Sequence, residues 1–311
     1  MKTLINIAAA LVISFGSFTL TAQQNPMFTH YMYNTLLVNP AYAGSREALT
    51  VTGLHRSQWT AFKGAPRTQT LTMHTPIGNE HIGVGLSLMN DRLGPTNNTS
   101  VSGQFAYRMK LNQKSKLSLG LSGGVDIYQA DLNSLNTDQT GDPVFENNLS
   151  NRAAPNFGFG AYYSRERFYA GVSVPNLIQN NYAETTPSGN LFLGEQQRHY
   201  YFIVGAMFDL TQGLAFKPTT LIKATAAAPM QADFTGTFIF HERFHIGGMY
   251  RIGDAYGVLV GVTLDQVYLG YSFDKSYGLN TFRYNQGSHE IVLRYDFIYA
   301  NKKQIRTPRH F

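Results

Sequence analysis

The residue types best suited to acid–base chemistry or metal binding are nine histidines and the carboxylates beside two of them. His289 precedes Glu290, and His241 precedes Glu242 and Arg243. Adjacent side chains on a strand point to opposite faces, so His289 and Glu290 are not expected to act on one ligand. The second group falls in a predicted turn. Both groups are interpreted as structural or solvated, and the sequence assigns no catalytic, cofactor-binding or metal-binding residue.

The absence of cysteine removes a further set of chemistries. The chain has no disulfides, thiolate zinc sites, iron–sulfur clusters or cysteine nucleophiles. It also lacks a glycine-rich phosphate loop followed by lysine. We therefore expect a noncatalytic protein without cofactors. An enzyme is kept as a third alternative, which would require activity to be lost when a single residue such as His289 is replaced.

Composition favours one all-β unit, although 311 residues could form two domains. Charged residues make up 14% of the chain, against about 25% in an ordinary soluble domain, while glycine, tyrosine and phenylalanine are abundant. With 43% hydrophobic residues, the chain has enough apolar surface to avoid disorder. The net charge of +6 is small and scattered, so nucleic acid is not expected as a partner.

The N-terminus has the pattern of a secretory signal. Lys2 is followed by an apolar run from Leu4 to Leu20, and Ala22 offers a small residue for cleavage. We interpret residues 1–22 as a cleaved signal peptide, with a retained membrane anchor as the alternative. Beyond residue 22 no apolar stretch approaches the ~18 residues that a membrane-spanning helix needs.

From residue 49 onward, apolar and polar residues alternate with a period of two, which is typical of strands. Near the end, Ile291, Leu293 and Tyr295 alternate with Val292 and Arg294. The predicted strands lie at about 50–59, 67–75, 81–90, 101–110, 117–127, 154–164, 167–174, 198–209, 213–224, 230–240, 243–252, 255–264, 267–274 and 291–297.

The connections between these strands indicate a membrane barrel. Every second connection is short, and the long ones, 89–99, 129–153, 175–197 and 274–288, fall on the other side. This is the layout of an outer-membrane barrel. Because lipid cannot satisfy backbone N–H and C=O groups, the strands must close into a ring. We predict an all-β fold, a transmembrane antiparallel β-barrel of about 14 strands over 49–299, with the lipid bilayer as a partner.

The segment 23–48, before the first strand, has a different pattern. Apolar residues recur there at spacings of three and four, which suggests about two helical turns. The turns end at Asn39-Pro40, because the residue before proline resists the helical region. We expect a partly helical plug inside the lumen or under its periplasmic mouth, with the N-terminus periplasmic; a flexible leader is the alternative. The predicted plug residues are Phe28, Tyr31, Asn34, Asn39, Pro40, Tyr42 and Gly44.

Several blocks of the sequence together resemble one family. The resemblance is to the PorP/SprF family, outer-membrane proteins of the type IX secretion and gliding-motility apparatus in Bacteroidetes. Matching blocks run in order along essentially the whole chain after the signal, and they are specific through their order and spacing. They include Gln24-x-Pro26-x-Phe28-x-x-Tyr31-x-x-Asn34, Asn39 to Gly44, His55 to Trp59, Gly64 to Thr70, Asn90-Asp91-x-x-Gly94-Pro95 and Gly287 to Phe297. A basic tail at 300–311 departs from the pattern.

The resemblance implies an outer-membrane barrel that supports secretion or cell-surface attachment of large proteins. Its expected partners are a secreted protein with a C-terminal sorting domain and other type IX secretion components. The main alternative is a general or substrate-specific outer-membrane porin, which ion conduction by the purified protein would favour.

Two sets of residues are candidates for these roles. The predicted lumen-facing charges either line a conduction path or pair across strands and hold the plug; they are Arg56, Arg108, Lys110, Asp126, Arg251, Asp274, Arg294 and Asp296. The second set surrounds the only tryptophan, at the end of the first strand, and the long connections, where adaptable polar and aromatic side chains suit a docking surface. The hypothesised partner-binding residues are Arg56, Gln58, Trp59, Phe62, Pro66, Tyr128, Phe145 and Tyr182. A tryptophan ring at the membrane interface is the alternative for Trp59.

Overall fold

The computed structural model describes residues 25–78, 81–134, 148–186, 189–226, 228–277 and 286–298. The predicted signal peptide, the basic tail and Phe145 lie outside these residues. The strands are β1 (Leu49–Ser57), β2 (Arg67–Ile77), β3 (Ile82–Leu93), β4 (Thr96–Lys110), β5 (Ser115–Ala130), β6 (Leu149–Arg165), β7 (Phe168–Val174), β8 (Asn181–Thr186), β9 (Gly189–Glu195), β10 (His199–Ala206), β11 (Phe208–Thr211), β12 (Leu214–Thr225), β13 (Ala228–Phe240), β14 (Phe244–Arg251), β15 (Ala255–Leu264), β16 (Val267–Ser276) and β17 (Ser288–Phe297). Single 3-10 turns occur at η1 (Tyr31–Tyr33), η2 (Thr35–Leu37), η3 (Pro40–Tyr42) and η4 (Leu132–Ser134).

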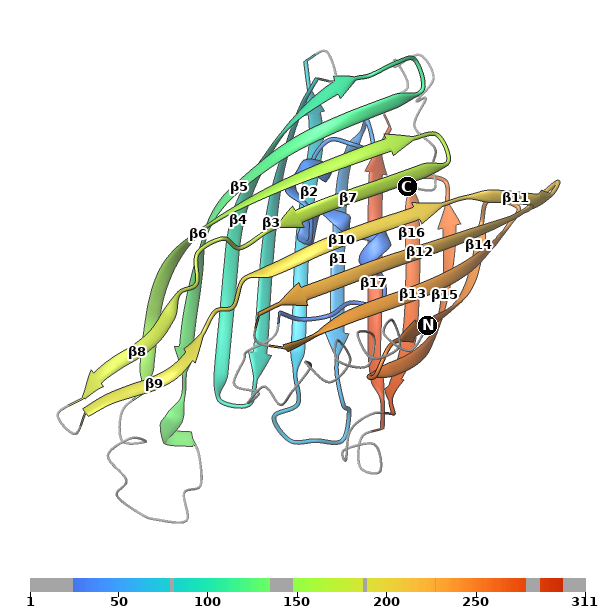
Figure 1. The fold of residues 1–311 in the computed structure, drawn as a ribbon. Coiled ribbons are helices and arrows are strands. Elements are labelled where there is room, and N and C mark those ends of the chain that lie inside the picture. The colour runs from blue at the N-terminus through green and yellow to red at the C-terminus, as the bar shows by residue number, and fades with distance from the viewer. Residues whose placement is uncertain are drawn as a thin grey trace, which may run out of the picture.

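The strands form a closed antiparallel β-barrel of 14 strands (Figure 1), which confirms the predicted fold. The first strand pairs with the last, β1 with β17, and β10 pairs with both β7 and β12, so that the ring has no open edge. A short strand, β11, continues β10 along β12, and β8 and β9 form a separate hairpin. No described helix is long and apolar enough to cross a membrane.

The two faces of the barrel wall differ as the alternation predicts. On β17, Ile291, Leu293 and Tyr295 are exposed on the outside, while Val292 and Arg294 are buried toward the lumen. The same division holds on β5, β14 and β16. An apolar outer face and a polar inner face are what a lipid-embedded barrel requires.

The short connections fall at one end of the barrel, as predicted, but one predicted long loop is a hairpin. The stretch 89–99 belongs to β3 and β4, which continue to a two-residue turn at Gly94-Pro95. Asn90 donates to Asn97 (2.8 Å) and to Thr99 (2.9 Å), so the side chains that resemble a loop in composition form polar cross-strand pairs. We call the end that carries the connections 58–66 and 94–95 the long-loop end, and the other the short-turn end.

A charge on the outer wall tests the assignment of the lipid face. Leu121 lies on β5 and is 58% exposed, whereas Leu111, 56% exposed, lies in the β4–β5 turn. We expect Leu121→Arg to lower the free energy of folding into lipid vesicles by about 2–4 kcal/mol, and Leu111→Arg by no more than about 1 kcal/mol, because the cost of a charge falls away from the bilayer midplane. Urea titration of vesicle-inserted protein measures both. Equal effects would contradict the assignment.

Candidate functional site: the filled lumen

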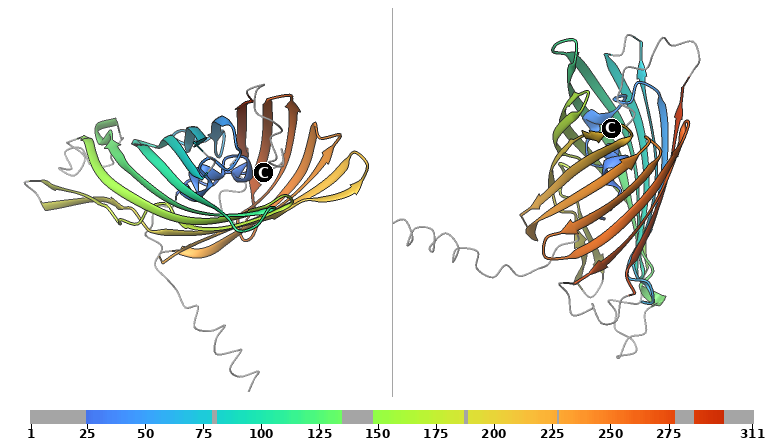
Figure 2. Two further views of the ribbon diagram at one scale, coloured as in Figure 1. Left: turned by 90° about the horizontal axis from the view of Figure 1, so that it is seen from above. Right: turned by 90° about the vertical axis from the view of Figure 1, so that its right-hand side faces the viewer.

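Residues 25–48, here called the plug segment, run lengthwise through the inside of the barrel. Figure 2 shows this segment in blue within the ring of strands, seen from above. It begins near the long-loop end, where Lys223 Nζ donates to the Asn25 carbonyl (3.2 Å), and it ends at Arg46 and Glu47 near the short-turn end, where β1 starts. The described part of the chain therefore enters the lumen at the long-loop end and leaves it at the short-turn end. All seven predicted plug residues are buried.

Local sequence explains the irregular shape of the plug segment. Three single 3-10 turns replace the two expected helical turns. Pro40 begins the third turn, and the Asn39 side chain caps it by accepting a hydrogen bond from the Ala41 N–H (2.9 Å). Backbone groups that such short turns leave unpaired must find partners elsewhere when they are buried, and here the barrel wall supplies several.

Near the long-loop end, a buried ionic cluster holds the start of the plug segment. Arg56 donates to both carboxylate oxygens of Asp274, at 2.6 and 2.9 Å, and to Glu290 at 3.3 Å. Glu290 in turn accepts the backbone N–H groups of Thr29 (3.0 Å) and His30 (2.7 Å), and its Oε1 lies 2.8 Å from His30 Nδ1. All of these side chains are buried. The cluster thus links three strands, β1, β16 and β17, to two residues of the plug segment.

The facing wall holds the plug segment through tyrosines. The Tyr31 hydroxyl lies 3.1 Å from Thr219 Oγ1 on β12 and donates to Thr235 on β13. Burial raises the pKa of Tyr31 above its ordinary value, although the threonine hydrogen bonds oppose this, so the hydroxyl keeps its proton. On the wall that carries the ionic cluster, Tyr33 stacks on Tyr268 of β16 with ring centroids 4.2 Å apart. The segment is therefore bonded to opposite sides of the barrel.

Glycines on the inner wall make room for the third turn of the plug segment. A Cβ atom at Gly120 on β5 would overlap the backbone of Ala41, and one at Gly160 on β6 would overlap the Asn39 side chain. Asn39 also donates to the Ala161 carbonyl (3.0 Å). Because no other residue type leaves this space, the wall is shaped to this turn.

Ion pairs fix the other end of the segment. Arg46 forms two hydrogen bonds with Asp296, at 2.9 and 2.8 Å, and Glu47 pairs with Lys116 and lies 3.8 Å from Arg108. Although burial disfavours the charged guanidinium, the Asp296 carboxylate raises the pKa of Arg46 above its ordinary value. The plug segment is thus tied by charge at both of its ends.

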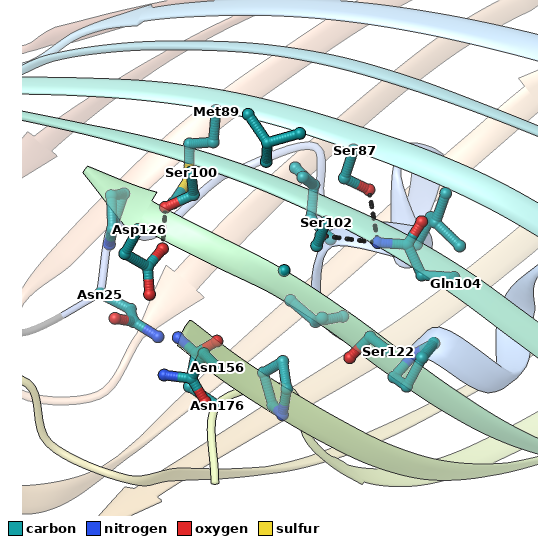
Figure 3. Close-up of a pocket in the computed structure, with 18 of the residues that line it drawn as sticks. Asn25, Ser87, Met89, Ser100, Ser102, Gln104, Ser122, Asp126, Asn156 and Asn176 are labelled. Atoms are coloured by element: carbon teal, nitrogen blue, oxygen red, sulfur yellow. Dashed lines mark hydrogen bonds between the residues drawn. The ribbon is translucent and has the colours of Figure 1, made fainter. Parts of the chain in front are cut away.

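A cavity of about 100 Å³ lies between the plug segment and strands β3 to β6 (Figure 3). Serines, amides and one carboxylate line much of it; Ser87, Ser102 and Gln104 form a hydrogen-bonded group within it. Space of this size holds a few water molecules.

The structure separates the predicted partner-binding residues into different environments. Arg56 and Tyr128 face the lumen and are 1% and 3% exposed, so they are withdrawn as parts of an outer surface. Pro66 is also buried, Gln58 and Trp59 are half-buried, and Phe62 is 41% exposed. Tyr182 lies on β8. Of the predicted lumen charges, Arg56, Arg108, Asp126, Arg251, Asp274 and Arg294 are buried, Asp296 is half-buried and Lys110 is exposed at a strand end.

Two stretches of the sequence carry the letters of catalytic motifs. His241-Glu242-Arg243-Phe244-His245 has the letters of H-E-x-x-H, but it lies in the β13–β14 turn and the start of β14 instead of on the helix that would bring both histidines to one metal. His241 is exposed, whereas His245 is buried against Tyr33 (3.2 Å). No group of three potential metal ligands occurs among the described residues.

The second stretch, Gly120 to Gly124, has the letters of G-x-S-x-G. That motif exposes its serine on a sharp turn between a strand and a helix. Here it lies within β5 and is paired with both neighbouring strands. Neither stretch has the geometry that its motif requires.

The fold and the filled lumen define the class: an outer-membrane β-barrel with an internal N-terminal segment. A family model described as "Type IX secretion system membrane protein PorP/SprF" matches residues 20–295. The chain therefore belongs to the PorP/SprF family, as its sequence blocks suggest.

Several solved structures have similar folds. They include the CymD monoaromatic hydrocarbon channel (9% identity, TM-score 0.47, covering 86% of this chain and 93% of that chain) and the Acinetobacter baumannii outer membrane protein Omp33 (10%, 0.46, 82% and 100%). The KdgM porin is similar at 12% identity and TM-score 0.36, covering 80% and 99%. No curated protein matches the chain.

A matched pair of glycines on β5 tests the fit of the plug segment. Gly120 faces Ala41, whereas Gly123 faces outward and has only ordinary contacts. We expect Gly120→Val to displace the third turn and to lower stability by about 1–3 kcal/mol, the usual cost of overpacking. Gly123→Val should leave stability unchanged or raised, because valine favours strands. Thermal unfolding and protease cleavage within residues 35–45 measure both effects; equal behaviour would contradict the fit.

Proposed function

We propose that this protein is a noncatalytic component of type IX secretion, which supports secretion or cell-surface attachment of large partner proteins with a C-terminal sorting domain. The observation that carries the proposal is the occupied lumen. Hydrogen bonds join the plug segment to strands on opposite sides of the ring: β1, β2, β6, β7, β12 to β14, β16 and β17. A barrel so filled suits a role as a rigid anchor better than a role as a solute path.

The long-loop end supports the proposed partner surface. In outer-membrane barrels this end faces the cell exterior. Phe62 is exposed there, and Trp59 Nε1 donates to Ser276 (3.4 Å), which fixes the indole near the rim. Trp59 and Ala61 have positive φ angles of 45° and 88°, a conformation that costs energy for residues other than glycine and is concentrated at functional sites. Gln58, Trp59 and Phe62 are thus retained in the proposed surface.

The conduction alternative is tested with engineered cysteines, since the chain has none. Thr72 Oγ1 donates to Asn34 Oδ1 (2.8 Å), so Asn34→Cys with Thr72→Cys should form a disulfide that tethers the plug segment to β2. In planar bilayers we expect low conductance from the wild type and from the double variant, oxidised or reduced. Large conductance in wild type that oxidation of the double variant abolishes would favour a channel with a movable plug.

The partner surface is tested in cells. Deleting the gene should remove one or a few large proteins from the surface or medium without a general effect on solute uptake. Replacing Trp59 and Phe62 with alanine should reduce surface display of the same proteins about tenfold, because aromatic anchors dominate interface energies. The matched control is Phe244→Ala at the short-turn end, 56% exposed. Unchanged display with a normally inserted double variant would overturn the assignment of the surface.

A further inference from the structure

Two arginines stand side by side on the outer wall of the barrel. Arg67, at the start of β2, lies directly opposite Arg92, near the end of β3, in the antiparallel register. Both are exposed. Directly opposed residues on one face have Cβ atoms about 4.5–5.5 Å apart, and like charges at that distance repel. Neither guanidinium forms a hydrogen bond or ion pair within the part of the chain that the structure describes.

The carboxylates of the same strands do not relieve this repulsion. Asp91 precedes Arg92 on β3, so its side chain faces the opposite side of the wall, where it accepts a hydrogen bond from Thr68 (2.6 Å). Lys63, in the connection 58–66, is exposed as well, and that connection is tied to the β3–β4 turn by the Gly94 N–H, which donates to the Gly64 carbonyl (2.8 Å). The outer end of β2 and β3 is therefore a concentration of positive charge.

The wall below the arginines changes from polar to apolar in two steps. The next outward pair is Gln69 opposite Asn90, and beyond it come Leu71 opposite Leu88 and Met73 opposite Leu86. Leu71 is 42% exposed and Met73 39%. On neighbouring β1, the outward His55 lies opposite Gln69, and Ser57 lies opposite Arg67. Guanidinium and hydroxyl groups, then amide and imidazole groups, then aliphatic groups follow one another from the long-loop end toward the middle of the membrane.

This order fits one kind of occupant. Arginine binds phosphate with paired, charge-assisted hydrogen bonds, amide and hydroxyl side chains bind sugar hydroxyls, and leucine and methionine contact acyl chains. We infer that Arg67 and Arg92 form a binding site for the phosphorylated headgroup of an outer-leaflet glycolipid, lipid A. A phosphate between the two guanidinium groups cancels their repulsion, and the acyl chains lie along Leu71, Met73, Leu86 and Leu88.

Native mass spectrometry of the full-length protein with added lipid A tests the inference. We expect wild type to retain lipid A, and R67Q with R92Q to retain about tenfold less, because hydrogen bonds between charged groups are lost. The control is R165Q with R243Q, which removes two exposed arginines at the short-turn end and should retain lipid A like wild type. Thermal unfolding confirms that both variants are folded.

Three further arms identify the chemistry that is recognised. Dephosphorylated lipid A should bind wild type about as weakly as lipid A binds R67Q with R92Q. Inorganic phosphate should not displace lipid A, since it lacks acyl chains; displacement would show a free-phosphate site and overturn the glycolipid assignment. Equal retention of phosphatidylglycerol, or undiminished retention of lipid A by R67Q with R92Q, would also overturn it.

Discussion

The architecture depends on hydrogen bonds between charged side chains of the barrel interior and the backbone groups that the plug segment leaves unpaired. A barrel wall that carries Arg56, Asp274 and Glu290 at zero to 2% exposure requires partners for those charges, because an unpaired buried charge is costly. The plug segment supplies the N–H groups of Thr29 and His30 to Glu290. The wall in turn supplies hydrogen-bond partners for backbone groups that the short 3-10 turns of the plug segment leave unpaired. Each would be unfavourable without the other.

The lipid solvent explains why the barrel was predictable from the sequence. Because every strand meets lipid on one face and polar groups on the other, the alternation along β17 assigns both faces residue by residue. Short turns were likewise recognisable. The extension of β3 and β4 through 89–99 was not, because beyond the membrane a hairpin no longer needs an apolar face, and its Asn90, Asn97 and Thr99 are typical of loops.

The interior was harder to predict for a different reason. The burial of the plug segment follows from its apolar residues, but its partners lie up to 261 positions away in sequence. The space for Asn39 and Ala41 depends on glycines in separate strands, Gly120 and Gly160, whose meaning appears only when those strands are adjacent. Tyr128 also shows this limit: its position near a long connection in the sequence did not reveal that its side chain faces inward.

Membership of the PorP/SprF family and the occupied lumen both support the proposed role in type IX secretion. The interior carries a tied segment, and the outward surfaces remain for interactions. Two parts of this surface have separate proposed roles. Protein contacts are proposed in the connection 58–66, at Trp59 and Phe62, and lipid contacts on the outer wall, at Arg67 and Arg92.

Hydrogen exchange of the plug segment in outer-membrane vesicles tests the central claim most directly. If the segment fills the lumen in the membrane, the amides of Thr29 and His30, bonded to Glu290, should exchange as slowly as those of β1 and β17. Exchange as fast as in the connection 58–66 would show that the segment leaves the lumen, and would contradict the account.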